Sequence, residues 1–176
     1  MNCRGTIFFL ALFFASVSAV CQGEIKSAGL TAGGVTCSLC SKAIYKALTK
    51  VATVADVQAD IQHSKYLIRF KDHAKVDLDQ LKKAVQDAGF SIASLEVTAL
   101  FDHVEIDNNS QVDLSNLHLQ FLKVKKQLLN GERKVVVIDK SFITGKEFTR
   151  YKAYLPSAED NSSLTEPFRI YHVTLL

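Results

Sequence analysis

Two spacings of apolar residues divide the amino-terminal half of the chain into strands and helices. Alternation of apolar and polar residues is typical of half-buried strands, whereas apolar residues every three or four positions predict amphipathic helices. The strands are expected at 24–30, 54–61, 66–70 and 92–97. The helices are expected at 40–51 and 78–88. The order is therefore βαββαβ, a split βαβ arrangement in which four antiparallel strands carry both helices on one face.

The second of these helices has recognisable ends. Asp77 is a suitable N-cap residue, and Gln80 stands three positions later as its capping-box partner. Gly89 is well placed to follow the last turn, where glycine adopts the left-handed conformation easily.

Helical periodicity fades after residue 98, and short extended runs replace it. Strands are expected at 117–124, 135–138, 148–154 and 168–173. Asn130-Gly131 between apolar runs is a typical hairpin turn. Residues 99–176 are therefore predicted to form a small all-β domain, either a five-stranded barrel resembling an OB-fold or a small sandwich. No catalytic constellation is visible there, and its aromatic residues favour a protein-docking surface.

Composition is that of a globular protein, with 48% hydrophobic and 22% charged residues among 176. The formal net charge is +3, without a basic run that would indicate nucleic-acid binding. Residues 1–19 resemble a cleavable signal peptide, with Arg4, a short apolar core and a small-residue site at Val17-Ser18-Ala19. We therefore expect an exported protein, periplasmic or secreted, without a membrane span after cleavage.

Cys21 leaves a second form of export open. Acylation of a new amino-terminal cysteine would anchor the protein to lipid through Cys21, although Val20 is an unusual residue before such a cysteine. Cys21 is also a candidate third sulfur ligand, if the amino-terminal segment folds back.

The most informative stretch is Gly34-Val35-Thr36-Cys37-Ser38-Leu39-Cys40. It places two sulfurs three positions apart, one on a flexible loop and one in the first turn of a helix. Thiolates are soft donors, so the pair suits Cu(I), Hg(II) or Zn(II) and suits Mg²⁺ or Ca²⁺ poorly. Free N–H groups at the helix start favour thiolates there. A redox-active or structural disulfide is the alternative.

Residues 24–98 resemble a heavy-metal-associated domain, the module of copper chaperones and periplasmic mercury-binding proteins. The loop matches that family's G-M-T-C-x-x-C, with Val35 in place of methionine, and Asp87-Ala88-Gly89-Phe90 matches its D-A-G-F/Y. The resemblance implies a ferredoxin-like fold and metal ligation by Cys37 and Cys40. We expect Cys37 to be the more exposed ligand.

Other residues have weaker claims to a role at this site. Thr36 is a candidate loop-orienting residue, and Phe90 is expected to pack beneath the site. His63, His73 and His103 are scattered and are expected at the surface.

The resulting hypothesis is a non-enzymatic carrier or scavenger of a soft metal ion, most simply Cu(I), which passes the ion to a metal-transporting or metal-accepting protein. A thiol–disulfide oxidoreductase is the alternative. Against it, no aromatic residue precedes the cysteine pair, and the only prolines are Pro156 and Pro167. An interaction module with an inert disulfide is a third hypothesis.

Overall fold

The computed structural model describes residues 23–114, 117–155 and 169–176. The expected signal peptide and Cys21 lie outside these residues, so cleavage, lipid anchoring and a third sulfur ligand remain predictions. Within the described residues, no helix is both long enough and apolar enough to cross a membrane.

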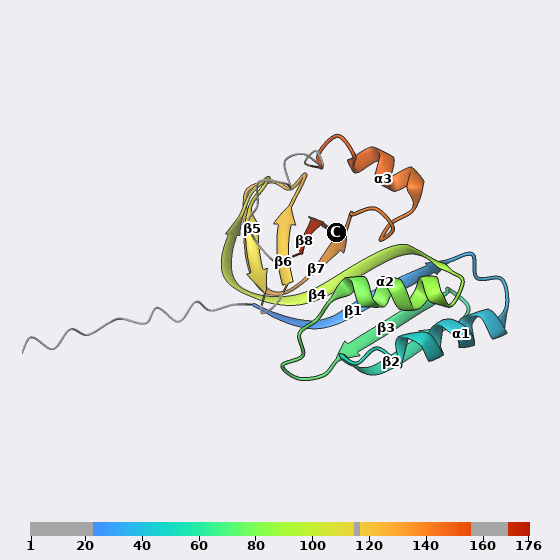
Figure 1. The fold of residues 1–176 in the computed structure, drawn as a ribbon. Coiled ribbons are helices and arrows are strands. Elements are labelled where there is room, and N and C mark those ends of the chain that lie inside the picture. The colour runs from blue at the N-terminus through green and yellow to red at the C-terminus, as the bar shows by residue number, and fades with distance from the viewer. Residues whose placement is uncertain (1–22, 115–116, 156–168) are drawn as a thin grey trace, which may run out of the picture.

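The amino-terminal half has the predicted order of elements (Figure 1). They are β1 (Glu24–Gly33), α1 (Ser38–Leu48), β2 (Val54–Asp60), β3 (Lys65–Phe70), α2 (Leu78–Asp87) and β4 (Ser91–Ile106). The strands are antiparallel, with β1 between β3 and β4 and with β2 at the edge. Both helices cover the same face of these strands. The prediction of a ferredoxin-like α+β module is therefore confirmed.

The ends of α2 follow from its sequence. The Asp77 carboxylate caps the helix, but it accepts the N–H of Asp79 at 2.9 Å and not that of Gln80, so the expected capping box is not formed. Gly89 has φ +89°, as predicted for the residue beyond the last turn. The buried face of α2 consists of Leu78, Leu81 and Val85.

The carboxy-terminal half extends the same sheet. Its elements are β5 (Gln111–Leu114), β6 (Leu117–Phe121), β7 (Gln127–Val137), α3 (Gly145–Tyr151) and β8 (Ile170–Leu175). The eight strands lie in the order β2-β3-β1-β4-β7-β8-β6-β5, with β6 and β8 parallel. Since β4 runs for 16 residues and pairs with both β1 and β7, the expected boundary at residues 98 and 99 falls inside a strand. A separate all-β domain is not confirmed.

Two local predictions in this half are wrong. Residues 145–151 form helix α3 where an extended stretch was expected, because Thr144 caps a helix by accepting the N–H of Glu147. Asn130-Gly131 does not end a strand either, since β7 passes through it. Gly131 has φ +76° and lies beside an irregularity in the β4–β7 register, so it accommodates a local distortion and not a hairpin turn.

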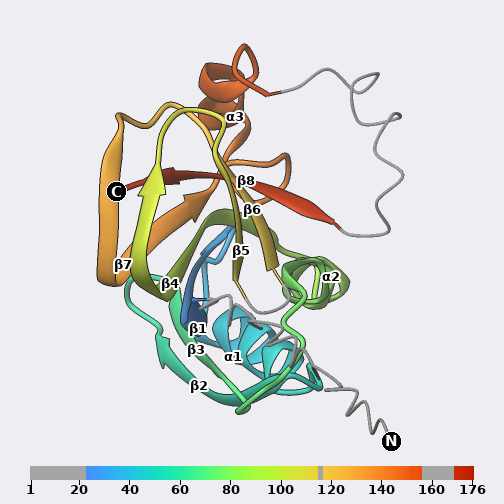
Figure 2. The ribbon, with the colours of Figure 1, turned by 90° about the vertical axis from the view of Figure 1, so that its left-hand side faces the viewer.

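One hydrophobic core runs through both halves. Its largest fully buried side chains include Leu30, Ile44, Tyr66, Ile68, Leu81, Leu95, Phe101, Phe121 and Phe142. A smaller cluster of Leu122, Ile138 and Ile143 packs with Phe148 and Tyr151 of α3. Helix α3 lies away from α1 and α2 in both ribbon views (Figures 1 and 2).

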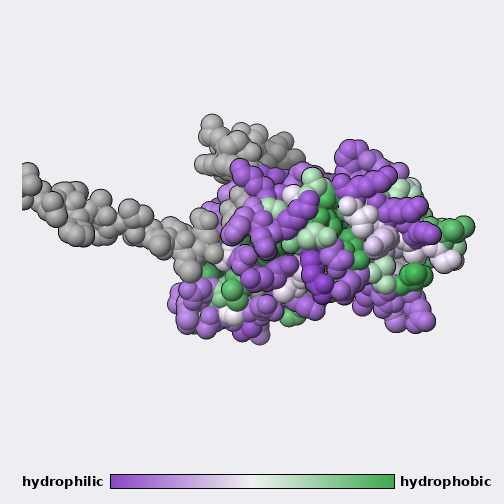
Figure 3. All heavy atoms as spheres, turned by 90° about the horizontal axis from the view of Figure 1, so that it is seen from below, coloured by the Kyte–Doolittle hydropathy of each residue, from purple (hydrophilic) through white to green (hydrophobic). Residues whose placement is uncertain are grey.

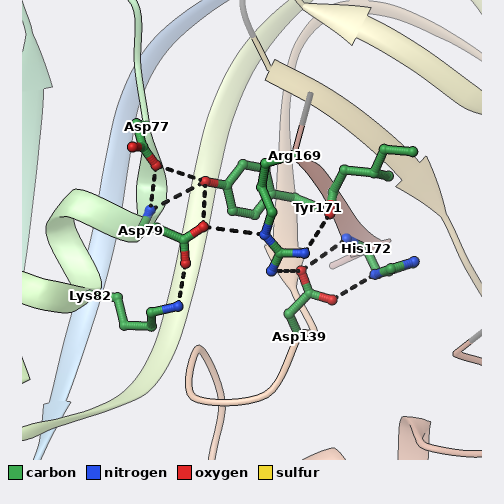
Figure 4. Close-up of polar contacts among 8 residues, drawn as sticks. Asp77, Asp79, Lys82, Asp139, Arg169, Tyr171 and His172 are labelled. Atoms are coloured by element: carbon green, nitrogen blue, oxygen red, sulfur yellow. Dashed lines mark hydrogen bonds and ion pairs between the residues drawn. The ribbon is translucent and has the colours of Figure 1, made fainter. Parts of the chain in front are cut away.

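A polar cluster joins the start of α2 to β8 (Figure 4). It consists of Asp77, Asp79, Lys82, Asp139, Arg169, Tyr171 and His172. The Tyr171 hydroxyl lies 3.0 Å from an Asp77 carboxylate oxygen and 3.1 Å from one of Asp79. Arg169 reaches Asp79 at 3.2 Å and Asp139 at 3.0 Å. Residues about 90 positions apart are thereby held together.

The inner end of this polar cluster is buried. Asp139 and His172 have side chains that are 9% and 7% exposed, and a carboxylate oxygen of Asp139 lies 2.6 Å from Nδ1 of His172. Burial raises the pKa of the Tyr171 hydroxyl, and the negative charges of Asp79 and Asp77 raise it further. Tyr171 therefore keeps its proton and serves as a hydrogen-bond donor to these carboxylates.

Candidate metal centre

The cysteine pair lies on the connection from β1 to α1, at the right-hand end of the molecule in Figure 1. Gly34 turns the chain with φ +79°, a conformation that other residues adopt at a cost. Val35 is half-buried and packs against the main core, which anchors the loop from beneath. The chain then enters α1 at Ser38.

Cys37 is the N-cap residue of α1. Its backbone is extended, with φ −147° and ψ 157°, and its Sγ accepts the N–H of Cys40 at 3.2 Å. Cys37 is exposed, whereas Cys40 in the first turn is half-buried, as expected from the sequence. The first turn contains no acidic residue that would oppose negative charge, so its free N–H groups and the helix dipole would favour thiolates at these two positions in reduced protein.

The two cysteines form a disulfide, with their Cα atoms 5.2 Å apart. The sulfurs therefore meet at one place near the surface, as the sequence predicts, but in the oxidised state. A disulfide sulfur is not a thiolate ligand, so this site takes up a soft metal ion only after the bond is reduced.

A buried polar pair lies beneath the first turn of α1. Tyr66 in β3 is 1% exposed, and its hydroxyl donates a hydrogen bond to the backbone oxygen of Ser41 at 3.3 Å. Burial raises the pKa of the Tyr66 hydroxyl. Ser41 is itself 2% exposed, and its side-chain oxygen has no hydrogen-bond partner among the described residues. The sequence analysis missed both residues.

An apolar groove of about 470 Å³ opens beside the cysteine loop, between α1 and the end of β2. Its wall includes Leu39, Tyr45 and Ile61, which are 76%, 38% and 54% exposed. Figure 3 shows hydrophobic side chains gathered at the right-hand end of the lower face, the end where the β1–α1 loop lies in Figure 1.

The remaining candidates from the sequence make no hydrogen bond, ion pair or ring contact with the cysteine pair among the described residues. Thr36 is exposed, and the loop-orienting hydrogen bond expected of it is not found there. Phe90 is half-buried against the main core. The histidines lie at the surface as expected: His63 pairs with Asp60 at 2.7 Å, and His103 with Asp102 at 2.6 Å.

In the part of the chain that the structure describes, no group of three or more histidine, cysteine, aspartate or glutamate side chains is arranged to hold a metal ion. Within the described residues, a metal site at Cys37 and Cys40 would therefore have two protein ligands. Such a site suits an ion that accepts two sulfurs and does not supply the four ligands that zinc prefers.

The fold and the paired sulfurs define a class of small α+β modules that present two cysteines at the start of a helix. Comparison with known proteins agrees: residues 30–91 match the heavy-metal-associated domain family. The mercuric transport protein periplasmic component of Serratia marcescens is 33% identical over 82 residues, which cover 47% of this chain and 89% of that protein. The chain therefore belongs to the heavy-metal-associated domain family.

Two further comparisons cover the same half of the chain. The mercuric transport protein periplasmic component of Pseudomonas fluorescens is 34% identical over 80 residues, or 46% of this chain and 87% of the relative. The crystal structure of oxidized MerP from Ralstonia metallidurans CH34 is 33% identical and covers 39% of this chain and 96% of that one, with a TM-score of 0.35. The family match ends at residue 91, so most of the carboxy-terminal half lies outside it.

Proposed function

We propose that this protein is a non-enzymatic carrier or scavenger of a soft metal ion, which it binds between the thiolates of Cys37 and Cys40. The observation that carries this proposal is the convergence of the two sulfurs at the start of α1, one exposed and one half-buried. Membership in the heavy-metal-associated domain family supports it.

The donor set favours a thiophilic ion of low coordination number. Two thiolates match the softness of Cu(I) and Hg(II), and a two-sulfur site leaves a side open for an incoming ligand. The sequence argument favours Cu(I), whereas the mercuric transport names of the relatives support Hg(II). Zn(II) is a weaker third candidate because it prefers four ligands.

Ligand exchange is the mechanism that this geometry favours. Once the disulfide is reduced, the exposed Cys37 is the sulfur that a partner's thiol or thioether displaces first, while Cys40 holds the ion from the helix. The ion then passes between proteins without being released to water. We expect the partner to be a metal-transporting or metal-accepting protein, and we expect both to act outside the cytoplasm, as the periplasmic relatives suggest.

A titration of reduced, anaerobic protein tests the proposal. Wild type should bind one equivalent of Cu(I) or Hg(II) against a competing chromophoric chelator, and the Cys37→Ser/Cys40→Ser double variant should lose that binding. Asp60→Asn/His63→Gln, which removes another exposed pair on the same module, should bind as wild type does. Equal affinity of wild type and the double cysteine variant would refute the proposal.

The disulfide itself favours a second candidate, a thiol–disulfide oxidoreductase. In that case the pair would cycle between oxidised and reduced states and transfer electrons to a protein disulfide. Catalytic reduction of insulin by the reduced protein would support this function, and a rate equal to that of dithiothreitol alone would exclude it.

A further inference from the structure

A small pocket lies on the face of the sheet opposite α1 and α2. Leu95 and Val97 belong to the main core beneath these helices, so Glu96 between them faces the other side. Glu96 is paired with Val136 of β7, and Val136 is paired with Thr174 of β8. Residues directly opposite one another in neighbouring strands point to the same face, so these three side chains form one row across the sheet.

Helix α3 forms the other wall of this pocket. The pocket has a volume of about 190 Å³, and its lining includes the row on the sheet together with Glu147 and Tyr151 of α3. Val136, Phe148 and Tyr151 pack against one buried cluster, which holds α3 against the sheet. Lys123 lies 5.5 Å from the centre of the Tyr151 ring, a cation–π contact that fixes the same helix. The pocket is therefore built between two elements that pack on each other.

The walls of this pocket carry two carboxylates and a buried hydroxyl. Glu96 is half-buried, and Glu147 is exposed and accepts a hydrogen bond from the Thr144 hydroxyl at 3.1 Å. Thr174 is 9% exposed, and its hydroxyl has no hydrogen-bond partner among the described residues. A buried hydroxyl of this kind is a group that a bound ligand can satisfy. Its position in the row directs it toward the pocket and so toward such a ligand.

The negative charges of the pocket are not neutralised within the part of the chain that the structure describes. Neither Glu96 nor Glu147 forms an ion pair there. Lys134, which is paired with Thr98 on the same face, is exposed and forms no ion pair among these residues either. The formal net charge of the protein is +3, so overall charge does not attract cations to it. Attraction of a cation to the pocket would therefore be local.

We propose that this pocket binds an alkylammonium or alkylguanidinium group, an organic cation that carries N–H groups on an aliphatic chain. The carboxylates of Glu96 and Glu147 supply charge-assisted acceptors, and the Thr174 hydroxyl supplies a neutral one. Val136 and Ile143 provide apolar contact for the methylene groups of the chain. Either a free amine or a lysine or arginine side chain of another protein presents this chemistry.

The size and the donor set of the pocket exclude other ligand classes. Its volume is below the roughly 300–1,000 Å³ of sites for drug-sized ligands, so it fits the end of one chain and not a nucleotide. A metal ion fits less well, because the described residues hold no group of three or more histidine, cysteine, aspartate or glutamate side chains arranged to bind one.

The experiment titrates the full chain with n-butylammonium chloride and follows the backbone amide signals by NMR. Saturable shifts with one-to-one stoichiometry should appear in β4, β8 and α3. Two probes on wild type separate the contributions: n-butanol lacks the charge, and tetramethylammonium lacks the N–H groups. Both should bind at least about tenfold more weakly than n-butylammonium. Equal binding of either probe would overturn the proposal, whatever the stability of any variant.

Variants then assign the binding to the pocket. Glu96→Gln and Glu147→Gln should each weaken n-butylammonium binding by about tenfold, and Thr174→Val by about threefold. Glu132→Gln is the matched control, because Glu132 is an exposed carboxylate on the same face of β7 that does not line the pocket. It should stay within about twofold of wild type. Unchanged affinity in both pocket glutamine variants, or an equal loss in Glu132→Gln, would contradict the assignment.

A further titration distinguishes the two sources of the cation. Nα-acetyl-lysine N-methylamide presents the same ammonium group on a peptide backbone. Binding of this compound as tight as that of n-butylammonium would identify the ligand as a protein side chain, and binding of n-butylammonium alone would identify it as a free amine. Because the measurement uses no metal and no cysteine, it can fail while the Cys37→Ser/Cys40→Ser titration still supports metal binding.

Discussion

At the scale of single residues, Gly34 shows how the backbone sets the position of the sulfurs. Its φ of +79° lies in the left-handed region, and a Cβ there would meet no atom within 4 Å. Any cost of substitution therefore comes from the backbone conformation and not from a clash. Since this residue turns the chain from β1 toward Cys37, a change of backbone conformation at Gly34 would displace Cys37.

Gly34→Ala is expected to destabilise the oxidised protein by about 1 kcal/mol, because an L-residue pays to adopt the left-handed conformation. Gly145→Ala is the control: Gly145 has equally open surroundings, lies in the first turn of α3 and has no positive φ, so alanine should be neutral or slightly stabilising. Urea midpoints of the two variants measure the difference. Similar losses in both would contradict the backbone explanation.

The sequence specified the cysteine site well at this scale and its surroundings poorly. Cys37 and Cys40 are close in sequence, so local helix geometry brings their sulfurs together without information about the rest of the fold. Tyr66 contacts Ser41 across 25 positions. Such a contact depends on the register of β3 beneath α1, which no local pattern reveals.

At the scale of secondary-structure elements, the join between α2 and β8 depends on charge. Burial acts to raise the pKa of Asp79, but the hydrogen bond from Lys82 and the positive charges of Lys82 and Arg169 outweigh it. The pKa of Asp79 therefore lies below its ordinary value of 3.8. A carboxylate of this kind stabilises the fold above the pKa of the unfolded chain, and that stabilisation is lost as pH falls through the folded pKa.

Acid should accordingly weaken the α2–β8 join through Asp79. In Asp79→Asn, the fall in the urea midpoint between pH 6 and pH 3 should be smaller than in wild type, because the variant has already lost the pH-dependent contribution. Asp56→Asn removes the more exposed carboxylate that Arg69 contacts and should keep the wild-type pH dependence. Identical pH profiles for wild type and Asp79→Asn would contradict the proposed role of Lys82 and Arg169.

The elements of the amino-terminal half were predictable because each has a clear period and a recognisable end. Helix α3 was missed although Phe148 and Tyr151 stand three positions apart, which is also a helical spacing, and Thr144 with Glu147 forms a capping pair. The strand pairing of the carboxy-terminal half could not be predicted from local sequence patterns. The parallel contact of β6 with β8 joins segments about 50 residues apart, such as His118 and Ile170.

At the scale of the whole molecule, the shared core and the strand β4 argue against two independent domains. Buried residues of both halves belong to one hydrophobic cluster, and β4 pairs with β1 on one side and β7 on the other. Unfolding of either half would expose apolar surface of the other. Cooperative loss of both halves is the physical consequence.

The full chain should therefore unfold in a single transition when heated. Amide hydrogen exchange at the centres of β3 and β8, which lie in different halves, should report the same opening free energy. Two transitions, or an opening free energy for β8 that is much lower than that for β3, would contradict a single cooperative unit.

The length of β4 also fixes the distance between the cysteine loop and the carboxy-terminal half. A module tethered by a flexible linker can search for its target, but here β1, which leads into the cysteine loop, and β7 of the carboxy-terminal half pair with the same strand, β4 (Figure 1). A partner protein that binds the carboxy-terminal strands would therefore meet the two sulfurs at a constant distance and in a constant orientation. Transfer of the proposed metal ion would then depend on how the two proteins align and not on the length of a linker.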